Sequence, residues 1–448
     1  MVIAWPGLRR QLPLTLALLL LAACARTPGA APPRTKSGAP SAAQPPAAGG
    51  PAAGGVSADA IAAFRGLGKL AFLRDGQLFV LDGAGGEVHA IAHTGAAASP
   101  AWSADGRWLA FRQGVGSSAE GIAIAGADGR VQPVAGVGNG GFVWSPAGAT
   151  LAVTPATGGL WLVQPGGAPQ QILTTQSGIS AAWAPDGQSL AYAITLPFTQ
   201  PEDRDDSLFT VPVSGGKPTQ QFISPRSGIQ WFTWTPDGTG VLFWQDPVHS
   251  ASLAADGVPL LRLPLPGSDA RKLAVTLTRP EWLSWAPDGQ RLALVEGSGR
   301  ELWRGKSVSI CTPAQEHCQP LLRADDGVSL DPAWSPAGGQ ITFVRADALN
   351  QAPGDARTGG AWAASRTLWL AGADGQGTRA LTAAGTGVYA PAWAKDGRHL
   401  LFVRENALWL IDTEKGAPVR LLDFPPSTAQ NAFYGSISYG QAYAWFRG

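Results

Sequence analysis

The chain of 448 residues carries 33 Lys and Arg against 32 Asp and Glu, and its formal charge at pH 7 is +1. The positive and negative charges are nearly equal in number, and the sequence has no basic block. This argues against nucleic-acid binding and against electrostatic attachment to an acidic membrane surface. With 58 Gly, 37 Pro and a single Met, the composition favours an all-β protein rich in tight turns.

The first 23 residues have the layout of an export signal. Arg9 and Arg10 form a short basic region, and the apolar run from Leu12 to Leu21 is too short to span a membrane. The run leads into Leu21-Ala22-Ala23-Cys24, which resembles the lipobox of bacterial lipoproteins. That resemblance implies a lipid on Cys24 and an anchor in the cell membrane or outer membrane, facing the periplasm or the exterior. An ordinary signal peptide cut beside a chance cysteine is the alternative.

The segment after Cys24 has the composition of a tether. Residues 25–58 consist mostly of Ala, Pro, Gly and Ser and contain no aromatic residue. Such a segment cannot bury enough apolar surface to offset the entropy lost on ordering it. We therefore predict a disordered tether over residues 24–65 and a folded part over residues 66–448.

One motif recurs seven times in the folded part. It consists of a small or apolar pair, a Trp, a small polar residue, a turn like Pro236-Asp237-Gly238, and an alternating apolar strand. Proline presets φ in such a turn, aspartate bonds its own backbone and glycine adopts a positive φ, so the motif predicts a tight hairpin. The motif tryptophans, which recur every 39 to 59 residues, are Trp102, Trp144, Trp183, Trp234, Trp285, Trp334 and Trp393.

Each repeat supplies four strands, here named a to d from the motif onward. Two further β-rich runs follow each hairpin, such as Leu160–Val163 and Gln171–Thr174 in the second copy. Four-stranded units arranged radially are the blades of a β-propeller. We expect the motif tryptophans to have a structural role, packing between neighbouring blades.

The two ends of the chain determine the number of blades. The segment from Lys69 to Ala92 matches strands b, c and d of a repeat, and its strand a is missing. The C-terminal Tyr443-Ala444-Trp445 matches the end of a strand a, and Trp445 lies 52 residues after Trp393. We therefore predict that the C-terminal strand joins the N-terminal blade and closes a ring of eight blades, with seven as the alternative.

The repeat resembles that of TolB and of the exported proteins that share its propeller. The resemblance covers roughly residues 66–448 and implies the fold, but a fold of this kind does not imply a function. TolB itself has an α/β domain before its propeller, whereas a tether is expected here, so TolB's partners are not carried over.

The extra length of the longer blades falls between strands b and c. Four consecutive blades have such insertions, which are Leu196–Asp206, Asp246–Val258, Gly297–Gly305 and Ala346–Arg366. The b–c and d–a connections of a meander emerge on one face, which we call the loop-rich face, and we expect the partner to bind there. The candidate contacts are aromatic anchors and an acidic run, namely Trp244, Trp303, Trp362, Glu202, Asp203, Asp205 and Asp206. A merely solvated loop is the alternative for the acidic run, which lacks the spacing typical of a calcium loop.

The sequence offers few groups for catalysis. His89 and His93 would face the same side of a strand about 13 Å apart, which is too far to share one metal ion. Ser436 and Ser438 match a nucleophile elbow only in part, and zinc-protease and phosphate-loop motifs are absent. We therefore predict no catalytic residue, no metal and no cofactor.

The two remaining cysteines flank a predicted c–d turn. Cys311 and Cys318 would face each other across that hairpin, and an exported protein meets an oxidising compartment. A structural disulfide is expected, with two buried free thiols as the alternative.

These features together predict a monomeric lipoprotein of the cell envelope. Its propeller would bind or scaffold an envelope protein or a glycan through the loop-rich face. The alternative is a propeller that binds or degrades polysaccharide, since some TolB-like propellers resemble oligogalacturonate lyases, whose metal centre needs clustered histidines. A quinone-dependent dehydrogenase also uses eight blades, but its repeat motif differs.

Overall fold

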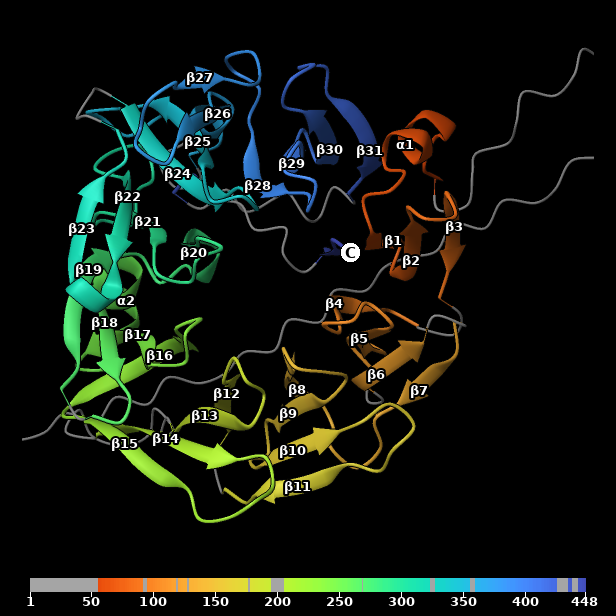
Figure 1. The fold of residues 1–448 in the computed structure, drawn as a ribbon, viewed down its shortest axis with the longest axis vertical. Helices are drawn as coiled ribbons and strands as arrows, with labels where there is room; N and C mark the ends of the chain where they lie inside the picture. Colours follow the sequence, from red (N-terminus) through yellow and green to blue (C-terminus); the bar gives the residue numbers. More distant parts are fainter. Residues whose placement is uncertain are drawn as a thin grey trace, which may run out of the picture. The chain divides into compact units, whose positions relative to one another are not determined.

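Figure 1 shows the computed structural model of the chain. It describes residues 55–91, 95–117, 120–126, 129–175, 178–194, 205–267, 269–322, 327–354, 359–424, 434–436 and 442–448. The predicted signal, Cys24 and most of the predicted tether lie outside these residues. Within them, no helix is both long and apolar enough to cross a membrane. The fold described below is that of the unit that begins at residue 49.

The described residues between 55 and 448 form eight four-stranded antiparallel sheets arranged as blades in a ring (Figure 1). We name seven blades by their motif tryptophan and the eighth, which joins the two ends of the chain, the closing blade. The first three are β4 (Ala98–Trp102), β5 (Trp108–Gln113), β6 (Gly121–Gly126) and β7 (Val131–Pro133); β8 (Gly140–Trp144), β9 (Leu151–Pro155), β10 (Leu160–Val163) and β11 (Gln170–Leu173); and β12 (Ile179–Trp183), β13 (Ser189–Ile194), β14 (Asp206–Pro212) and β15 (Thr219–Ser224).

The next four blades follow in chain order. They are β16 (Ser227–Trp234), β17 (Gly240–Pro247), β18 (Val258–Pro264) and β19 (Arg271–Thr276); β20 (Ser284–Trp285), β21 (Leu292–Glu296), β22 (Ser307–Thr312) and β23 (His317–Pro320); β24 (Gly327–Trp334), β25 (Gln340–Asp347), β26 (Thr367–Gly372) and β27 (Arg379–Ala380); and β28 (Tyr389–Trp393), β29 (His399–Arg404), β30 (Ala407–Asp412) and β31 (Val419–Asp423). The closing blade contains β1 (Lys69–Arg74), β2 (Gln77–Asp82), β3 (Glu87–Ala90) and β32 (Tyr443–Phe446). The short helices are α1 (Ala58–Ala63), α2 (Ala251–Asp256), α3 (Gly360–Ala363), η2 (Pro280–Trp282) and η3 (Pro313–Gln315).

The closing blade joins the two ends of the propeller, and the prediction of eight blades is confirmed. Strand β32 pairs antiparallel with β1, so that Trp445 lies opposite Leu70. The Trp445 indole N–H also donates to the carbonyl of Leu67 at 2.7 Å. One C-terminal strand thus completes a sheet whose other three strands come from the N-terminal side, and it covers the free edge of β1.

The folded part begins earlier than residue 66, so that predicted boundary is wrong. Helix α1 starts after Ser57, whose hydroxyl accepts a hydrogen bond from the Ala60 amide at 3.1 Å. Val56, Ala60 and Phe64 recur at four-residue spacing, and all three are buried against the propeller. This narrow apolar face is enough to hold the end of the predicted tether on the ring.

The motif tryptophans connect each blade to its neighbour. In five blades the indole N–H donates to the carbonyl of the residue before the corresponding tryptophan of the adjacent blade. These bonds run from Trp102 to Ala444 (3.2 Å), Trp144 to Ala101 (2.9 Å), Trp183 to Val143 (3.0 Å), Trp234 to Ala182 (3.1 Å) and Trp393 to Ala333 (3.1 Å). The pattern is interrupted at Trp334, whose buried indole N–H has no hydrogen-bond partner among the described residues.

Replacing Trp144 with Phe is expected to destabilise the fold more than replacing Trp334 with Phe. Both rings are buried, but only the first change removes a hydrogen bond and leaves the Ala101 carbonyl without that donor. The difference in the free energy of unfolding should be about 1–2 kcal/mol. Equilibrium denaturation of the two variants measures this difference. Equal losses of unfolding free energy in the two variants would show that the indole hydrogen bond contributes nothing to stability.

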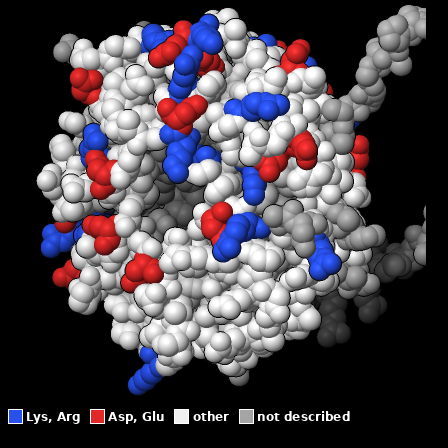
Figure 2. Space-filling model, turned by 45° about the vertical axis from the view of Figure 1, so that its right-hand side comes forward, with Lys and Arg blue, Asp and Glu red and all other residues white. Residues whose placement is uncertain are grey.

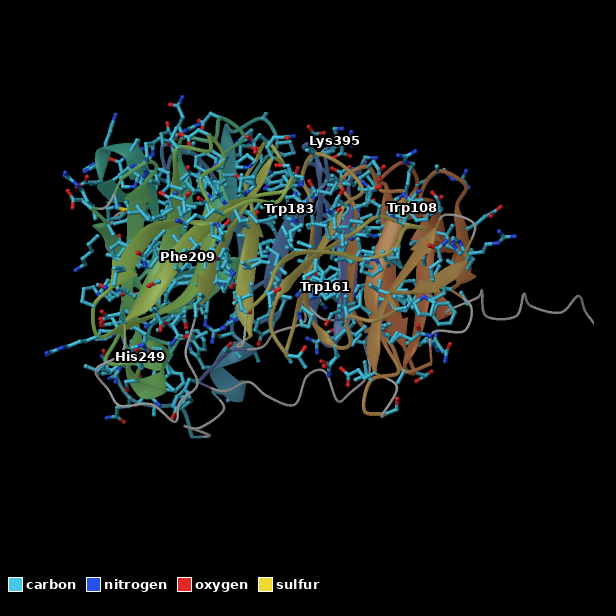
Figure 3. All side chains as sticks on the ribbon, turned by 90° about the horizontal axis from the view of Figure 1, so that it is seen from below. Trp108, Trp161, Trp183, Phe209, His249 and Lys395 are labelled. Carbon is cyan, nitrogen blue, oxygen red and sulfur yellow. A yellow bond between two sulfur atoms is a disulfide. The ribbon has the colours of Figure 1, made fainter. Side chains whose placement is uncertain are left out.

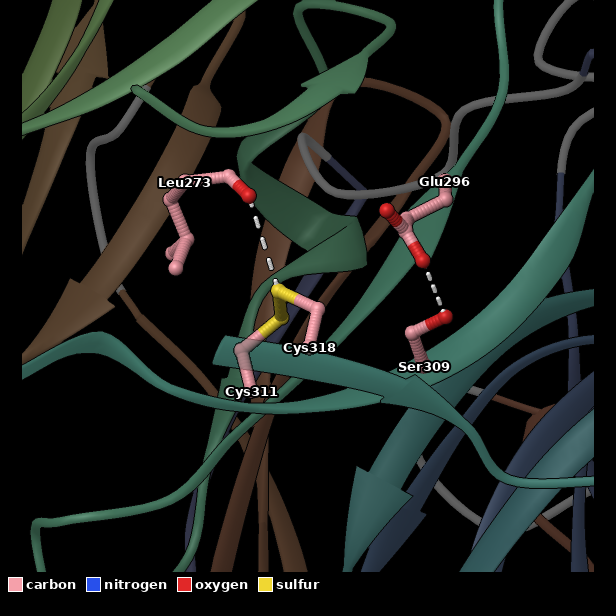
Figure 4. The surroundings of a disulfide bond; sticks show 5 residues. All are labelled: Leu273, Glu296, Ser309, Cys311 and Cys318. Atoms are coloured by element: carbon pink, nitrogen blue, oxygen red, sulfur yellow. Dashed lines mark hydrogen bonds between the residues drawn. A yellow bond between two sulfur atoms is a disulfide. The ribbon is translucent and has the colours of Figure 1, made fainter. Parts of the chain in front are cut away.

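The predicted disulfide between Cys311 and Cys318 is confirmed. The two residues lie directly opposite each other on β22 and β23, with their Cα atoms 4.0 Å apart (Figure 4). The Cys318 sulfur also lies 3.6 Å from the Leu273 carbonyl oxygen in the preceding blade. Closing so short a loop contributes about 2–3 kcal/mol on the chain-entropy model.

Candidate functional site

The blade connections emerge on two opposite faces of the ring. Lys395, in the turn between β28 and β29, lies on one face, and His249, in the connection between β17 and β18, lies on the other (Figure 3). The connections β17–β18, β21–β22 and β25–β26 contain the predicted b–c insertions, and they include α2 and α3. The insertion between β13 and β14 falls largely outside the described residues.

The three tryptophans predicted as surface anchors are buried, so that prediction is wrong. Trp244, Trp303 and Trp362 are at most 4% exposed. The Trp244 indole donates to the Thr276 hydroxyl at 2.7 Å, and the Trp362 indole donates to a backbone carbonyl at 2.8 Å. Trp244 lies on β17, in a core shared with the Trp285 blade, and Trp303 and Trp362 pack into the core cluster that spans several blades.

The acidic run is divided between different environments. Glu202 and Asp203 lie outside the described residues, and Asp205 is exposed. Asp206 is only 1% exposed and accepts a hydrogen bond from the Ile229 amide at 2.9 Å. Its other oxygen lies 3.2 Å from Nε2 of His249. Asp206 therefore joins the Trp183 blade to the Trp234 blade, and predicting it as a surface contact or as part of a solvated loop is wrong.

A cavity of about 330 Å³ opens on the inner side of the ring, and we call it the channel-mouth pocket. The first strand of each blade lies nearest the ring centre (Figure 1), and this pocket is formed where β24, β28 and β32 meet η2. Its lining is mainly apolar and aromatic, with four charged residues. It is formed by Arg279, Glu281, Trp282, Leu302, Asp331, Pro332, Arg366, Tyr389, Ala390, Pro391, Ala392, Ser436 and Tyr443.

Backbone irregularities in two inner strands shape this pocket. The register of β24 and of β28 shifts at a bulge, and the bulged Asp331 and Ala390 have φ of 49° and 48°. Such left-handed geometry is uncommon for residues other than glycine and is maintained by surrounding contacts. Here the Asp331 carboxylate accepts hydrogen bonds from the Trp282 indole at 2.6 Å and from the Ala390 amide at 3.2 Å. Asp331 thus holds three consecutive blades together.

Arg366 is the buried cation of the pocket. It is 2% exposed, and its guanidinium carbon lies 4.4 Å from the Tyr389 ring centroid and 5.1 Å from that of Trp362. One terminal nitrogen donates to the Gly435 carbonyl, whereas Nε has no hydrogen-bond partner among the described residues. Burial lowers the pKa of Arg366, and the nearby positive charge of Arg279 acts in the same direction.

Arg279 lies at the open side of the pocket. Its guanidinium lies 3.4 Å from the Glu281 carboxylate and stacks over the Trp282 ring at 5.1 Å. Figure 2 shows one face of the molecule, on which acidic and basic side chains are intermixed around the hollow of the ring. Within the channel-mouth pocket, the distinctive feature is the burial of the Arg366 cation.

A second buried cation stabilises the connection between β21 and β22. The Lys306 ammonium donates to three backbone carbonyls, those of Ser298 and Glu301 at 2.9 Å and that of Arg304 at 3.2 Å. Burial lowers the pKa of Lys306 to about 8, with Arg304 and Arg279 adding to the effect and Glu301 opposing it.

The stability of the fold should depend on pH through Lys306. Between about pH 8 and the ordinary lysine pKa near 10.5, Lys306 is protonated to a greater extent in the unfolded chain than in the folded protein. The free energy of unfolding therefore rises with pH over this range. Relative to a Lys306→Met variant, the wild type should gain about 2 kcal/mol between pH 8 and pH 10. Denaturant titrations at several pH values test this, with Lys395→Met as the control for losing one lysine. A constant difference between wild type and Lys306→Met would contradict it.

The histidines lie on separate elements of the fold. His89 is on β3, His317 on β23 and His399 on β29, whereas His93 lies outside the described residues. In the described part of the chain, no group of three His, Cys, Asp or Glu residues is placed to hold a metal ion. Ser436 lines the channel-mouth pocket, and Ser438 lies outside the described residues.

Comparison with known proteins identifies the fold. No family model and no curated protein matches the sequence. Among solved structures, dipeptidyl peptidase 4 of Porphyromonas gingivalis matches with a TM-score of 0.58 at 10% identity, over 80% of this chain and 58% of that one. A eukaryotic initiation factor matches with a TM-score of 0.52 at 15% identity, over 80% and 86%. TolB of Acinetobacter baumannii matches with a TM-score of 0.37 at 18% identity, over 56% and 62%.

Identities this low show the fold alone, and the chain spans little more than half of the peptidase. The propeller that the TolB-like motif implies is confirmed. The site residues Arg279, Asp331 and Arg366 were not found from the sequence. Their signals in the sequence are weak: Asp331 directly precedes the Pro-Ala-Trp of its repeat, and Arg366 is the last residue of the longest insertion.

Proposed function

We propose that this protein is a binding module of the cell envelope, whose channel-mouth pocket receives a segment of an envelope protein. The observation that carries the proposal is the pocket itself, which opens at the ring centre between inner strands of consecutive blades. Rigid scaffolds commonly bind partners at such concave, mainly apolar places that also hold a few polar groups.

The lining suits binding better than an acid–base reaction. The Asp331 carboxylate is occupied by two N–H donors, and Glu281 is paired with Arg279. The aromatic rings of Trp282, Tyr389 and Tyr443 supply large contact areas at small entropic cost. Anchoring through a lipid on Cys24 would keep the propeller at the envelope, and it belongs to the same proposal.

Site-specific photocrosslinking in intact cells tests this function. A benzophenone amino acid at Glu281, at the pocket rim, should give one discrete protein adduct. The same group at Lys395, on the opposite face, is the matched control and should not give that adduct. Filling the pocket with a Ser436→Trp substitution should weaken the Glu281 adduct. The pocket would be excluded as the binding site if both positions gave the adduct in equal yield, or if Ser436→Trp left the yield of the Glu281 adduct unchanged.

A further inference from the structure

We infer that the channel-mouth pocket binds a carboxylate carried on an apolar or aromatic stem, with Arg366 as its main partner. This inference rests on the proposed function and names the chemical group that the pocket recognises. A small organic acid and the C-terminal residue of a polypeptide both present this group.

The first argument is the unsatisfied charge of Arg366. A guanidinium has five N–H donors, yet the described acceptor is a single backbone carbonyl, that of Gly435. Its Nε is buried without a partner, and no described carboxylate forms an ion pair with it. Keeping a cation buried with so few partners is unfavourable, and a carboxylate entering the pocket would supply the missing acceptors.

The second argument is that the carboxylate that interacts electrostatically with Arg366 already has hydrogen-bond donors. Asp331 interacts electrostatically with Arg366, but its two oxygens accept hydrogen bonds from Trp282 and Ala390. The Asp331 side chain therefore maintains the pocket walls and leaves the guanidinium available. Arg279, at the open side, adds a second positive charge that an incoming anion would meet first.

The third argument concerns the rest of the pocket lining, which determines the kind of stem that can carry the carboxylate. Beside the arginines stand the rings of Trp282, Tyr389 and Tyr443 and the aliphatic Leu302 and Pro332. A volume of about 330 Å³ is at the lower end of the range of ligand pockets. The pocket thus fits one carboxylate with a stem the size of a single large side chain.

Calorimetric titration of the whole protein tests the inference directly. The probes are N-acetyl-phenylalanine and its amide, and a tetrapeptide ending in Phe with a free or an amidated C-terminus. Each free acid should bind at least about tenfold more tightly than its amide, because hydrogen bonds to a charged group are involved. Comparable binding of the two acids supports a small-acid ligand, and much tighter binding of the peptide acid supports a polypeptide C-terminus. Equal binding of acid and amide, or no binding of any probe, would overturn the inference.

Substitution of Arg366 separates binding from stability. Arg366→Met should abolish the preference for acid over amide while the melting temperature stays unchanged or rises, since a buried unpaired charge is removed. The matched control is Arg404→Met, which removes another arginine that stacks on a tryptophan and has a buried, partnerless Nε. That control should keep the preference. Arg279→Gln, at a partly exposed position, should weaken acid binding, and it provides a second test should Arg366→Met fail to fold.

The crosslinking experiment distinguishes the two proposals. If the Glu281 adduct forms but acid and amide bind alike, carboxylate recognition is wrong and the binding module stands. If the acids bind preferentially but no adduct forms, the carboxylate site stands and protein binding is wrong.

Discussion

Removing residues 442–448 is expected to lower the melting temperature by on the order of 10 °C and to cause aggregation. The deletion takes away β32 and exposes the backbone edge of β1 along four paired residues. It also removes Trp445, whose indole bonds to Leu67 and whose ring packs 6.4 Å from that of Phe64. The Ala444 carbonyl, which accepts the Trp102 indole bond, is lost as well. The closing blade would therefore lose its innermost strand and, at the same time, its indole hydrogen bond from the Trp102 blade.

Differential scanning calorimetry and light scattering measure these effects. Deletion of Gly448 alone is the matched control, because it removes an exposed residue whose terminal oxygen accepts a hydrogen bond from Lys395 at 2.9 Å. That variant should unfold within a few degrees of the wild type. If the longer deletion also unfolds there and stays monomeric, the ring does not depend on β32 for closure.

Most of the fold could be predicted because its signals are local and repeated. The Trp and Pro-Asp-Gly-like motif specifies a hairpin in each copy, and Tyr443-Ala444-Trp445 retains the end of a strand a. The disulfide was predictable for the same reason, since Cys311 and Cys318 flank one short turn. Helix α1 was missed because it has six residues with Ala60 as its buried residue, flanked by the buried Val56 and Phe64, in a segment rich in Ala, Gly and Pro.

The pocket could not be predicted because its residues come from different blades. Asp331 lies on β24 and Arg366 just before β26, whereas Arg279 lies between β19 and β20, and the packing of consecutive blades brings them together. The property that singles out Arg366 is the lack of acceptors around it, which no local sequence pattern encodes. The burial of Trp303 could not be predicted either, because the composition of a loop does not show whether the loop packs against the blades.

Replacing Asp206 with Ala is expected to lower the free energy of unfolding by about 2–5 kcal/mol, because each buried donor left without its acceptor costs about 1–3 kcal/mol. The change leaves the Ile229 amide and His249 Nε2 buried without their acceptor. Asp205→Ala is the matched control, because the neighbouring carboxylate is exposed and accepts one hydrogen bond, from the Arg226 amide at 2.9 Å. Asp205→Ala should lower the free energy of unfolding by about 1 kcal/mol.

Urea titrations of both variants, with Asp206→Asn as a third, separate hydrogen bonding from charge. The side-chain amide oxygen introduced by Asp206→Asn can still accept from Ile229, so this variant should lie between wild type and Asp206→Ala. Crosslinking from Glu281 should survive in every variant that folds, because Asp206 lies outside the channel-mouth pocket. A stable Asp206→Ala protein that loses the adduct would restore Asp206 as a contact for the partner. A destabilised variant that keeps the adduct would establish it as the joint between two blades.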